Sequence, residues 1–471
     1  MQRRQDIAII GGGPAGLVAA SVSAQLGLRV TLVEKTALLG GDCLHTGCVP
    51  SKTLLHLAQT VQLTRQGVQD GLLASMPEVD FGAAIDRVRS VIEQIQRHDD
   101  PARFRGYGCD VRFGAARFVG PREISVQDEI IRARRILIAT GSSPTRPPIA
   151  GLEEAGYDTS DSIFTRHELP GHLVVLGAGP VGVELAQAFV RFGARVTLVE
   201  MAGQVLPMHE AAVAAELQRV LAREGVSIRT SATVQSVRRD GDSRQLQLAD
   251  GATIECDRIL VATGRRPALH ELGLDAAGIV YDGKGIRVDA RQRTTQRHVY
   301  AAGDVCGPYP FTHMAEYQAG IALANMVFRF PKKADYRVVP RVVYTDPEVA
   351  TVGLDSAGAD AQGIRYDTVE FPVREIDRAL TAGVDGGFCR LLISKGRIIG
   401  ASMICPQAGE LIHELALAMR VNAGIRDLSE LVHAYPTYAQ IHRRTATKHY
   451  AHLLQSRRLR LLAWCMNRLL P

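Results

Sequence analysis

The feature that most constrains the fold of this chain is a glycine-rich segment that occurs twice. The first copy, DIAIIGGGPAGLVAASVSAQLGLRVTLVEK, spans residues 6–35, and the second, HLVVLGAGPVGVELAQAFVRFGARVTLVEM, spans residues 172–201. Each copy contains a short apolar strand, a glycine-rich turn, a helix rich in Ala, Val and Leu, and a second strand. This is the pattern of a βαβ unit, so the chain is predicted to be an α/β protein with two Rossmann-like domains.

The glycines in both copies have the spacing of a dinucleotide-binding turn, G-x-G-x-x-G. Glycine permits the tight turn, the close approach of the backbone to a pyrophosphate, and close packing of helix on strand. The N-terminus of the following helix then presents free N–H groups and a positive dipole end to the phosphates. We therefore expect two bound dinucleotides, one at Gly11, Gly13 and Gly16 and one at Gly177, Gly179 and Gly182.

Each second strand ends in a glutamate that lies 18 residues beyond the third glycine, Glu34 in the first copy and Glu200 in the second. A carboxylate at this place can accept hydrogen bonds from ribose hydroxyls. Glu200 would also repel a 2′-phosphate, and no Arg follows it within the next several residues, so NADH should be preferred to NADPH. The alternative is that Glu200 faces solvent and that other loops decide the preference.

The composition is that of a large globular protein. The 471 residues are 46% hydrophobic and 22% charged, enough for packed cores in about three domains. The net charge of +6 comes from mostly interleaved acidic and basic residues, which disfavours a nucleic-acid binder. The N-terminal apolar run, Ile7 to Ile10, is too short for a signal peptide, and no run of about 18 apolar residues predicts a spanning helix. We expect a cytoplasmic location.

Cys43 and Cys48 are the one pair among the eight cysteines that lies close in sequence, within GGDCLHTGCVPSK. Pro50 favours a helix start here, and a helix N-terminus together with Lys52 would stabilise a thiolate. Such a pair can cycle between dithiol and disulfide. Zinc binding is a rival interpretation, but no second Cys/His pair at ligand spacing accompanies the first, so no structural metal is expected. Two buried, inert cysteines are the other alternative.

These motifs, with ATG at 139–141 and TTQRHVYAAGDV at 294–305, resemble the pyridine nucleotide–disulfide oxidoreductase family. The resemblance runs from residue 6 to about residue 445, in the family's order. It implies FAD at the first glycine-rich turn and NAD(P)H at the second. It also implies a homodimer in which the C-terminal domain of one subunit completes the active site of the other.

The resemblance further implies roles for individual residues. Cys48 resembles the cysteine that lies against the flavin and forms a charge-transfer thiolate, and Cys43 resembles the interchange thiol that meets substrate. Lys52 resembles the lysine beside the flavin, Glu184 the glutamate paired with that lysine, and Asp304 the aspartate that binds the ribityl chain. Further cofactor-binding residues lie in the two ATG segments: Thr140, Gly141 and Gly264.

Changes in sequence character predict three domains and a tail. An FAD-binding domain is expected over residues 1–149 and 273–335, and an NAD(P)H-binding domain over 150–272. From Tyr336 the pattern predicts an antiparallel sheet with helices, hence an α+β dimerisation domain over 336–452. The tail, 453–471, is basic and apolar, and its part from 457 to 471 is predicted either to lie in a membrane interface or to pack on the protein.

One segment departs from the disulfide-reducing members of the family, which carry H-P-T-x-x-E. Here the segment is HAYPTYAQ, with Tyr435 in place of the His and Gln440 in place of the Glu. A Tyr, with an ordinary pKa near 10, is a poorer proton shuttle than a His near 6.5. Mercuric reductases resemble this chain in having Tyr there. We therefore predict a mercuric reductase-like oxidoreductase that reduces a soft metal ion, held at Cys43 and Cys48, or a small electrophile.

Other interpretations stay open. The tail holds Cys465 alone, where mercuric reductases end in a cysteine pair, and Asp42 should raise the pKa of the neighbouring Cys43. The enzymatic alternative is dihydrolipoamide dehydrogenase-type activity with His433 as a displaced base. The non-enzymatic alternative is a flavin redox sensor or a membrane-associated electron-transfer partner. A lone His is more often a hydrogen-bonded structural residue, and Tyr435 is also compatible with interface packing.

Overall fold

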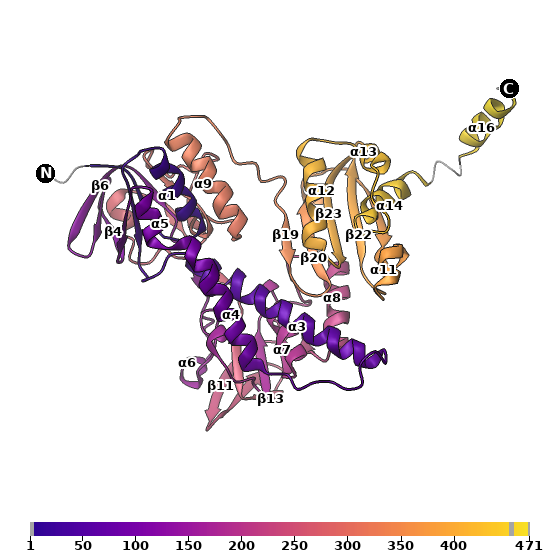
Figure 1. The fold of residues 1–471 in the computed structure, drawn as a ribbon, viewed down its shortest axis with the longest axis horizontal. Helices are drawn as coiled ribbons and strands as arrows, with labels where there is room; N and C mark the ends of the chain where they lie inside the picture. Colours follow the sequence, from indigo (N-terminus) through magenta and orange to yellow (C-terminus); the bar gives the residue numbers. More distant parts are fainter. Residues whose placement is uncertain (1–3, 452–455, 470–471) are drawn as a thin grey trace. The chain divides into compact units, whose positions relative to one another are not determined.

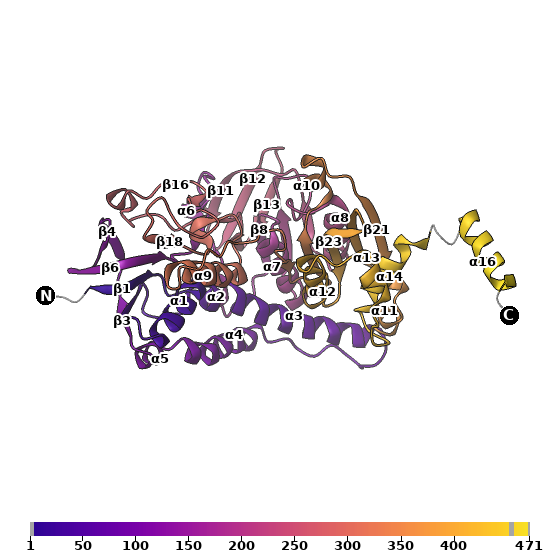
Figure 2. The same cartoon turned by 90° about the horizontal axis from the view of Figure 1, so that it is seen from above.

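The computed structural model describes residues 4–451 and 456–469 of the chain. Figures 1 and 2 show the helices and strands of these residues. The residues form two compact units. The first unit comprises Met1–Gly177, Ala188–Val199 and Ala232–Asp335, and the second comprises Ala178–Gln187, Glu200–Ser231 and Tyr336–Pro471.

The first unit is built on a seven-stranded sheet with the order β3-β2-β1-β6-β5-β4, in which β18 also pairs with β6. Strands β3, β2, β1, β6 and β18 run parallel, whereas β4 and β5 are antiparallel. Their bounds are β1 (Gln5–Ile10), β2 (Val30–Glu34), β3 (Cys109–Phe113), β4 (Ala116–Gly120), β5 (Glu123–Val126), β6 (Glu129–Ile138) and β18 (Val299–Ala301).

Strand β1 shows why this sheet needs cover on both faces. Ile7 and Ile9 pack into a core shared with helices α1 (Pro14–Gln25) and α9 (Thr312–Met326), whereas Ala8 and Ile10 face a second core. Successive side chains of a strand point to opposite faces, so a strand buried on both sides is apolar throughout. The remaining helical elements of this unit are α2 (Gly41–His45), α3 (Cys48–Gln69), α4 (Phe81–Gln96), η1 (Arg97–Asp99), α5 (Pro101–Gly106), α6 (Leu152–Ala155), η2 (Ile163–Thr165), η3 (Leu274–Ala277) and η4 (Asp304–Cys306).

The second copy of the repeated segment also forms the predicted elements. Strand β8 (His172–Leu176) leads into helix α7 (Pro180–Phe192), and β9 (Arg195–Val199) and β14 (Arg258–Val261) flank β8 in parallel. The predicted pair of Rossmann-like βαβ units is thereby confirmed. The other strands of the first unit are β7 (Ser142–Pro144), β11 (Val234–Asp240), β12 (Ser243–Leu248), β13 (Thr253–Cys256), β15 (Arg265–Pro267), β16 (Tyr281–Asp282) and β17 (Gly285–Ile286).

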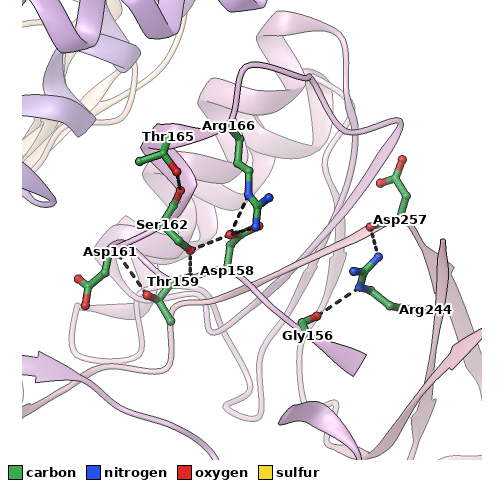
Figure 3. Close-up of polar contacts among 9 residues, drawn as sticks. All are labelled: Gly156, Asp158, Thr159, Asp161, Ser162, Thr165, Arg166, Arg244 and Asp257. Atoms are coloured by element: carbon green, nitrogen blue, oxygen red, sulfur yellow. Dashed lines mark hydrogen bonds and ion pairs between the residues drawn. The ribbon is translucent and has the colours of Figure 1, made fainter. Parts of the chain in front are cut away.

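Polar contacts of buried side chains fix the segment that follows β7 (Figure 3). The carboxylate of Asp158, 2% exposed, accepts from Arg166 Nε at 3.1 Å and Nη2 at 3.0 Å, and from Ser162 Oγ at 2.6 Å. Nearby, Arg244 Nε donates to the carbonyl oxygen of Gly156 at 3.2 Å. A buried carboxylate with a guanidinium and a hydroxyl as partners holds its turn in one conformation.

The second unit contains the antiparallel sheet predicted from Tyr336 onwards, with the order β19-β20-β23-β22-β21. Helix α12 packs on β20 and β23, and α14 packs on β21 and β22. The bounds are β10 (Ser227–Arg229), β19 (Arg341–Val343), β20 (Glu348–Gly353), β21 (Asp367–Pro372), β22 (Phe388–Ser394), β23 (Arg397–Cys405), α8 (Ala211–Arg223), α10 (Ser356–Ala361), η5 (Val373–Glu375), α11 (Asp377–Thr381), α12 (Ala408–Arg420), α13 (Ile425–Glu430), α14 (Gln440–His449) and α16 (Arg457–Leu469).

The three-domain division of the sequence stays a prediction. The compact units follow other boundaries, because they group most of the predicted NAD(P)H-binding segment with the first unit and residues 178–187 and 200–231 with the second. Within residues 4–451 and 456–469, no helix is both long and apolar enough to cross a membrane. Of the predicted tail, residues 453–455 and 470–471 lie outside the described residues.

Candidate active site

The first glycine-rich turn has the shape that a pyrophosphate requires. Gly11 has a φ of +109°, and a Cβ at this position would lie 2.2 Å from the carbonyl oxygen of Ala139. A Cβ at Gly16 would lie 1.9 Å from the carbonyl oxygen of Gly11. Pro14 is the first residue of α1, where it leaves the helix N-terminus intact. Glycine alone permits this turn, and the helix end that follows it can bind phosphate.

Glu34, the last residue of β2, lies against the same turn. Its Oε2 accepts from the backbone N–H of Gly12 at 2.7 Å, and its Oε1 accepts from that of Thr36 at 2.9 Å. The Thr36 hydroxyl also donates to Oε1 at 3.0 Å. A carboxylate has about four acceptor sites, so these three bonds orient it and leave one site for a ribose hydroxyl. The first turn and the Glu34 carboxylate therefore lie together, as the predicted dinucleotide site requires.

The second turn repeats this arrangement. Gly177 has a φ of +99°, and a Cβ there would lie 2.6 Å from the carbonyl oxygen of Ala262. Glu200 accepts through Oε2 from the N–H of Ala178 at 2.7 Å, and through Oε1 from a second backbone N–H at 2.8 Å. Gly179 precedes Pro180, the first residue of α7, and Gly182 is in the first turn of that helix. The residues of this turn also fit a dinucleotide.

The two ATG segments end their strands with left-handed glycines. Gly141 has a φ of +69° and Gly264 a φ of +109°. Thr140 Oγ1 donates to a backbone carbonyl oxygen at 3.0 Å. Asp304 opens η4, and its Oδ2 accepts from Ser142 Oγ at 2.6 Å. The predicted cofactor residues Thr140, Gly141 and Asp304 thus lie close together in the first unit.

The structure brings Cys43 and Cys48 into side-chain contact. Cys43 is the third residue of α2 and Cys48 is the first residue of α3, and both are free thiols. Cys48 Sγ lies 3.4 Å from Oγ1 of Thr312, the first residue of α9. The hydrogen bond with Cys48, followed by burial, raises the pKa of Cys43 far above its ordinary value. Two sulfurs in contact, one beside a hydroxyl, can form a disulfide or hold one ligand together.

The charge beside Cys43 is balanced in a way that the sequence does not reveal. The largest causes of the raised pKa of Cys43 are Cys48 and burial, not the adjacent Asp42 as predicted. The Asp42 carboxylate forms an ion pair with Nη2 of Arg265. Arg265 Nε also donates to Ser142 Oγ at 2.8 Å, and its Nη1 to Ser160 Oγ at 3.4 Å, in the turn anchored by the buried carboxylate of Figure 3. Arg265 thereby compensates the negative charge next to the thiol.

The cysteines in the cores differ from Cys43 and Cys48 in their burial. Burial raises the pKa of Cys109 to about 11, and that of Cys256 and of Cys306 to about 12. Such thiols stay protonated and unreactive at neutral pH. Cys43 is half-buried and Cys48 is exposed. The alternative of two buried cysteines therefore does not describe Cys48, which is exposed, whereas the raised pKa does not distinguish Cys43 from the core thiols.

Two predicted residues belong to different units. Lys52 lies on α3, four residues after Cys48, in the first unit. Glu184 lies on α7 in the second unit; its side chain is buried, and its Oε1 accepts from the backbone N–H of Tyr344 at 2.8 Å. Their pairing near the flavin stays a prediction.

The C-terminal residues have unlike environments. Tyr435 is 69% exposed, and its hydroxyl donates to Asp377 Oδ2 at 3.0 Å, a bond that raises the pKa of the Tyr435 phenol. Gln440 is the first residue of α14. The His433 side chain is 5% exposed, and its Nε2 lies 3.1 Å from Glu414 Oε1. Tyr435 thus lies on the surface, whereas His433 is turned into the unit. A base role for His433 stays a prediction.

Several contacts were not anticipated from the sequence. Thr312 lies 264 residues from Cys48, and Arg265 lies 223 residues from Asp42, so no local pattern connects them. One signal was present for Arg265: it follows the second ATG segment, whereas serine follows the first. No sequence pattern predicted that Glu414 and His442 lie beside His433.

Comparisons with known protein families define the class of this protein. Residues 5–319 match the family described as pyridine nucleotide-disulphide oxidoreductase, and residues 339–445 match its dimerisation domain. The chain therefore belongs to the pyridine nucleotide-disulphide oxidoreductase family, as its motifs predict.

Individual relatives carry different activities in their names. Mitochondrial dihydrolipoyl dehydrogenase of Pisum sativum is 34% identical over 466 residues, which cover 94% of this chain and 91% of the relative. Mercuric reductase of Bacillus cereus is 32% identical over 441 residues, which cover 92% and 70%. The Cu(II) complex of the HOCl-induced flavoprotein disulfide reductase RclA from Escherichia coli has a TM-score of 0.85 at 29% identity and covers 94% of this chain and 99% of that one.

Membership in the family makes the protein a flavin-dependent oxidoreductase that uses FAD and a nicotinamide nucleotide. The two glycine-rich turns, each with its strand-end glutamate, fit these cofactors. The dimerisation domain supports a homodimer. The similar identities to a dihydrolipoyl dehydrogenase and a mercuric reductase do not decide between their substrates.

Proposed function

We propose that the protein transfers electrons from NADH to a soft metal ion or a small electrophile, with Cys43 and Cys48 as its redox-active pair, in the manner of mercuric reductase. The observation that carries the proposal is Tyr435 at the place of the family's proton-shuttling His. Its hydroxyl is engaged by Asp377, which raises its pKa, so the phenol keeps its proton at neutral pH. Gln440, in place of the partner Glu, cannot supply charge to an imidazolium.

The proton balance explains why this substitution selects the substrate. Reduction of a divalent ion, NADH + M²⁺ → NAD⁺ + M⁰ + H⁺, releases a proton and requires none. Reduction of an organic disulfide, NADH + RSSR + H⁺ → NAD⁺ + 2 RSH, needs an acid for the leaving thiolate. A site in which Tyr435 and Gln440 replace the family's His–Glu pair therefore suits the first reaction better than the second.

FAD, when bound, passes two electrons between the nicotinamide and the cysteine pair. Two residues set the surroundings of that pair. Thr312 lies beside the sulfur of Cys48, and Arg265 compensates the charge of Asp42, next to Cys43. Both thiols must lose their protons to bind a soft ion as thiolates. Because the pKa of Cys43 is raised, metal binding by the reduced protein should strengthen as pH rises.

A turnover panel tests the proposal. NADH oxidation is measured with Hg(II), Cu(II), lipoamide, glutathione disulfide and a quinone. We expect a metal ion to exceed both disulfides by at least about tenfold in kcat/KM, since a positioned acid contributes about 10²–10⁴-fold. The double variant Tyr435→His, Gln440→Glu should raise disulfide reduction and leave metal reduction nearly unchanged. Brisk lipoamide reduction by the unmodified protein would overturn the proposal.

A second variant separates chemistry from packing at the same position. Tyr435→Phe removes the bond to Asp377 and the ionisable group together. Since the phenol stays protonated, we expect the pH profile of metal reduction to be unchanged from about pH 6 to 9. A shifted profile would show that Tyr435 takes part in proton transfer.

Dihydrolipoamide dehydrogenase-type activity is the second candidate, favoured by the 34% identity to the Pisum sativum enzyme. It requires a base, and His433 is the residue closest in sequence to Tyr435 that could act as one. Because the His433 side chain is only 5% exposed, it has little access to a substrate, and the first proposal fits the structure better. Lipoamide turnover that is fast and is lost in His433→Ala would establish the second candidate instead.

The proposal also covers the electron donor, the partner subunit and the location of the protein. Glu200 at the second turn should exclude a 2′-phosphate, so NADH is the proposed donor. In the homodimer, Tyr435 of the partner subunit is proposed to complete the site at Cys43. The protein is proposed to act in the cytoplasm.

Helix α16 is proposed to contact membrane surfaces. Arg457, Arg458 and Arg460 accompany the exposed apolar side chains of Leu461, Leu462 and Trp464. A basic amphipathic helix with Trp binds anionic interfaces. Co-sedimentation with anionic liposomes should be lost on deletion of residues 457–471. Unchanged co-sedimentation would contradict this role and favour packing of the tail on the protein. It would also contradict the alternative that the protein is a membrane-associated electron-transfer partner.

A further inference from the structure

We propose that the second unit contains a binding site for a divalent transition-metal ion of the Zn²⁺ class, formed by Glu414, His433 and His442. Glu414 lies on α12, His442 lies on α14, and His433 lies in the segment between α13 and α14. One ligand atom from each residue lies within 4.8 Å of the other two. Two imidazole nitrogens and one carboxylate oxygen are ligands that such ions prefer.

Two short distances link the three side chains of this cluster. Glu414 Oε1 lies 3.1 Å from His433 Nε2, and Glu414 Oε2 lies 3.0 Å from His442 Nδ1. Tetrahedral bonds of about 2.0–2.1 Å place neighbouring ligand atoms about 3.3 Å apart. Because the two contacts use different oxygens of Glu414, this side chain would shift so that one oxygen and the two imidazole nitrogens bind the same ion, with a fourth position open to water.

The hydrogen-bond inventory of His433 indicates a cation between the side chains. Its Nδ1 donates to the carbonyl oxygen of Leu431 at 3.2 Å. In the neutral ring, Nε2 then presents its lone pair to the Glu414 carboxylate, which is favourable only with a proton or a metal ion between them. A ring N–H given to a backbone carbonyl is also the usual second contact of a metal-binding histidine.

His442 supplies an independent observation. Its side chain is 0% exposed, and neither ring nitrogen makes an aligned hydrogen bond to any described residue, although Nδ1 lies 3.0 Å from Glu414. A buried nitrogen without an aligned partner is uncommon, and a metal bond would satisfy Nδ1.

The location suggests what the ion would do. All three ligands belong to one unit, and His433 lies two residues before Tyr435. An ion here would join α12, α14 and the segment that carries Tyr435. This nitrogen–oxygen site is separate from the two thiols and does not depend on which substrate they reduce.

Metal binding can be measured without turnover. The FAD-loaded protein, with Cys43 and Cys48 oxidised to the disulfide and other accessible thiols alkylated, is treated with EDTA, desalted and titrated with Zn²⁺ against a chromophoric chelator. We expect one Zn²⁺ per chain, with a Kd below about 1 µM. His433→Gln should weaken this binding at least tenfold. The matched control is His413→Gln, an exposed histidine beside Glu414 on α12, which should bind as the unmodified protein does.

A second readout guards against variants that do not fold. Because His442 is fully buried, His442→Gln is interpreted only if its FAD absorbance and circular dichroism match the unmodified protein. Zn²⁺ should raise the Tm of the unmodified protein and of His413→Gln, and not that of His433→Gln. A folded protein that binds no Zn²⁺ below about 100 µM, or equal binding in His433→Gln, would overturn the site and leave a proton-shared cluster.

Discussion

The two glycine-rich turns have the same local geometry but different neighbours. In each, the first glycine has a positive φ and the strand-end glutamate binds the N–H of the second residue of the turn. In each, a following loop donates one backbone hydrogen bond, from Gly40 to Gly12 and from Leu206 to Ala178. The repeated sequence therefore encodes the turn, the carboxylate and one loop contact alike.

The two turns differ in the residues that pack against them. A Cβ at Gly12 would lie 2.6 Å from Leu39 Cδ2, and a Cβ at Gly41 would lie 2.8 Å from the Cα of Gly13. At the second turn, Ala178 already carries a methyl group, and no described atom lies within 4 Å of a Cβ built at Gly179. The loop that leads to Cys43 thus packs against the first turn, whereas the second turn has a buried alanine, Ala178, at the position of Gly12. The two turns therefore share a phosphate-binding geometry but differ in the residues that surround it.

The largest expected effect comes from closing the first turn. Gly11→Ala would place Cβ against the carbonyl oxygen of Ala139 and would strain a backbone with positive φ. We expect loss of at least about 90% of the FAD bound after purification, measured as flavin absorbance per chain. Gly106→Ala, at a helical glycine with open space, is the control. Normal FAD content in Gly11→Ala would break the assignment of this turn.

Closing the second turn should have a separate effect. Gly177→Ala meets the carbonyl oxygen of Ala262 in the same way. We expect FAD content to stay normal while the KM for NADH rises at least about tenfold. Gly283→Ala, with no described atom near its Cβ, serves as control. Loss of FAD with an unchanged KM would mean that the two turns are assigned the wrong way round.

The glutamates provide a smaller effect that sharpens the comparison. Glu200→Ser should reduce the ratio of kcat/KM for NADH over NADPH by at least about tenfold, because the carboxylate no longer repels the 2′-phosphate. Glu34→Gln, at the other turn, should leave this ratio unchanged. An unaltered ratio in Glu200→Ser would show that other loops decide the preference.

The smallest expected effect concerns the loop over the first turn. Arg265→Gln removes the partner of Asp42 and leaves an uncompensated charge next to Cys43. The pKa of Cys43 should rise further, so alkylation of the reduced protein by iodoacetamide at about pH 8 should slow about two- to fivefold. The exposed neighbour Arg266→Gln is the control. Equal rates would show that Arg265 has no electrostatic role at the thiol.

These regions also show what the sequence could predict. Spacing alone located both turns, the strand-end Glu34 and Glu200, and the cysteine pair, because each depends on residues close in the chain. The partners of that pair could not be predicted. Thr312 and Arg265 reach it from more than 200 residues away, and the Glu414 cluster joins three separate elements. Such contacts depend on tertiary packing, for which one sequence has no local signal.

The most direct test of the account is an anaerobic titration with NADH. If Cys43 and Cys48 form one redox centre with the FAD of the first turn, NADH should produce a long-wavelength thiolate-to-flavin absorption band in the unmodified protein. The band should persist in Cys465→Ser, whose thiol lies in α16, and should be absent in Cys48→Ser. Absence of the band in the unmodified protein, or its persistence in Cys48→Ser, would contradict the assignment of the redox pair.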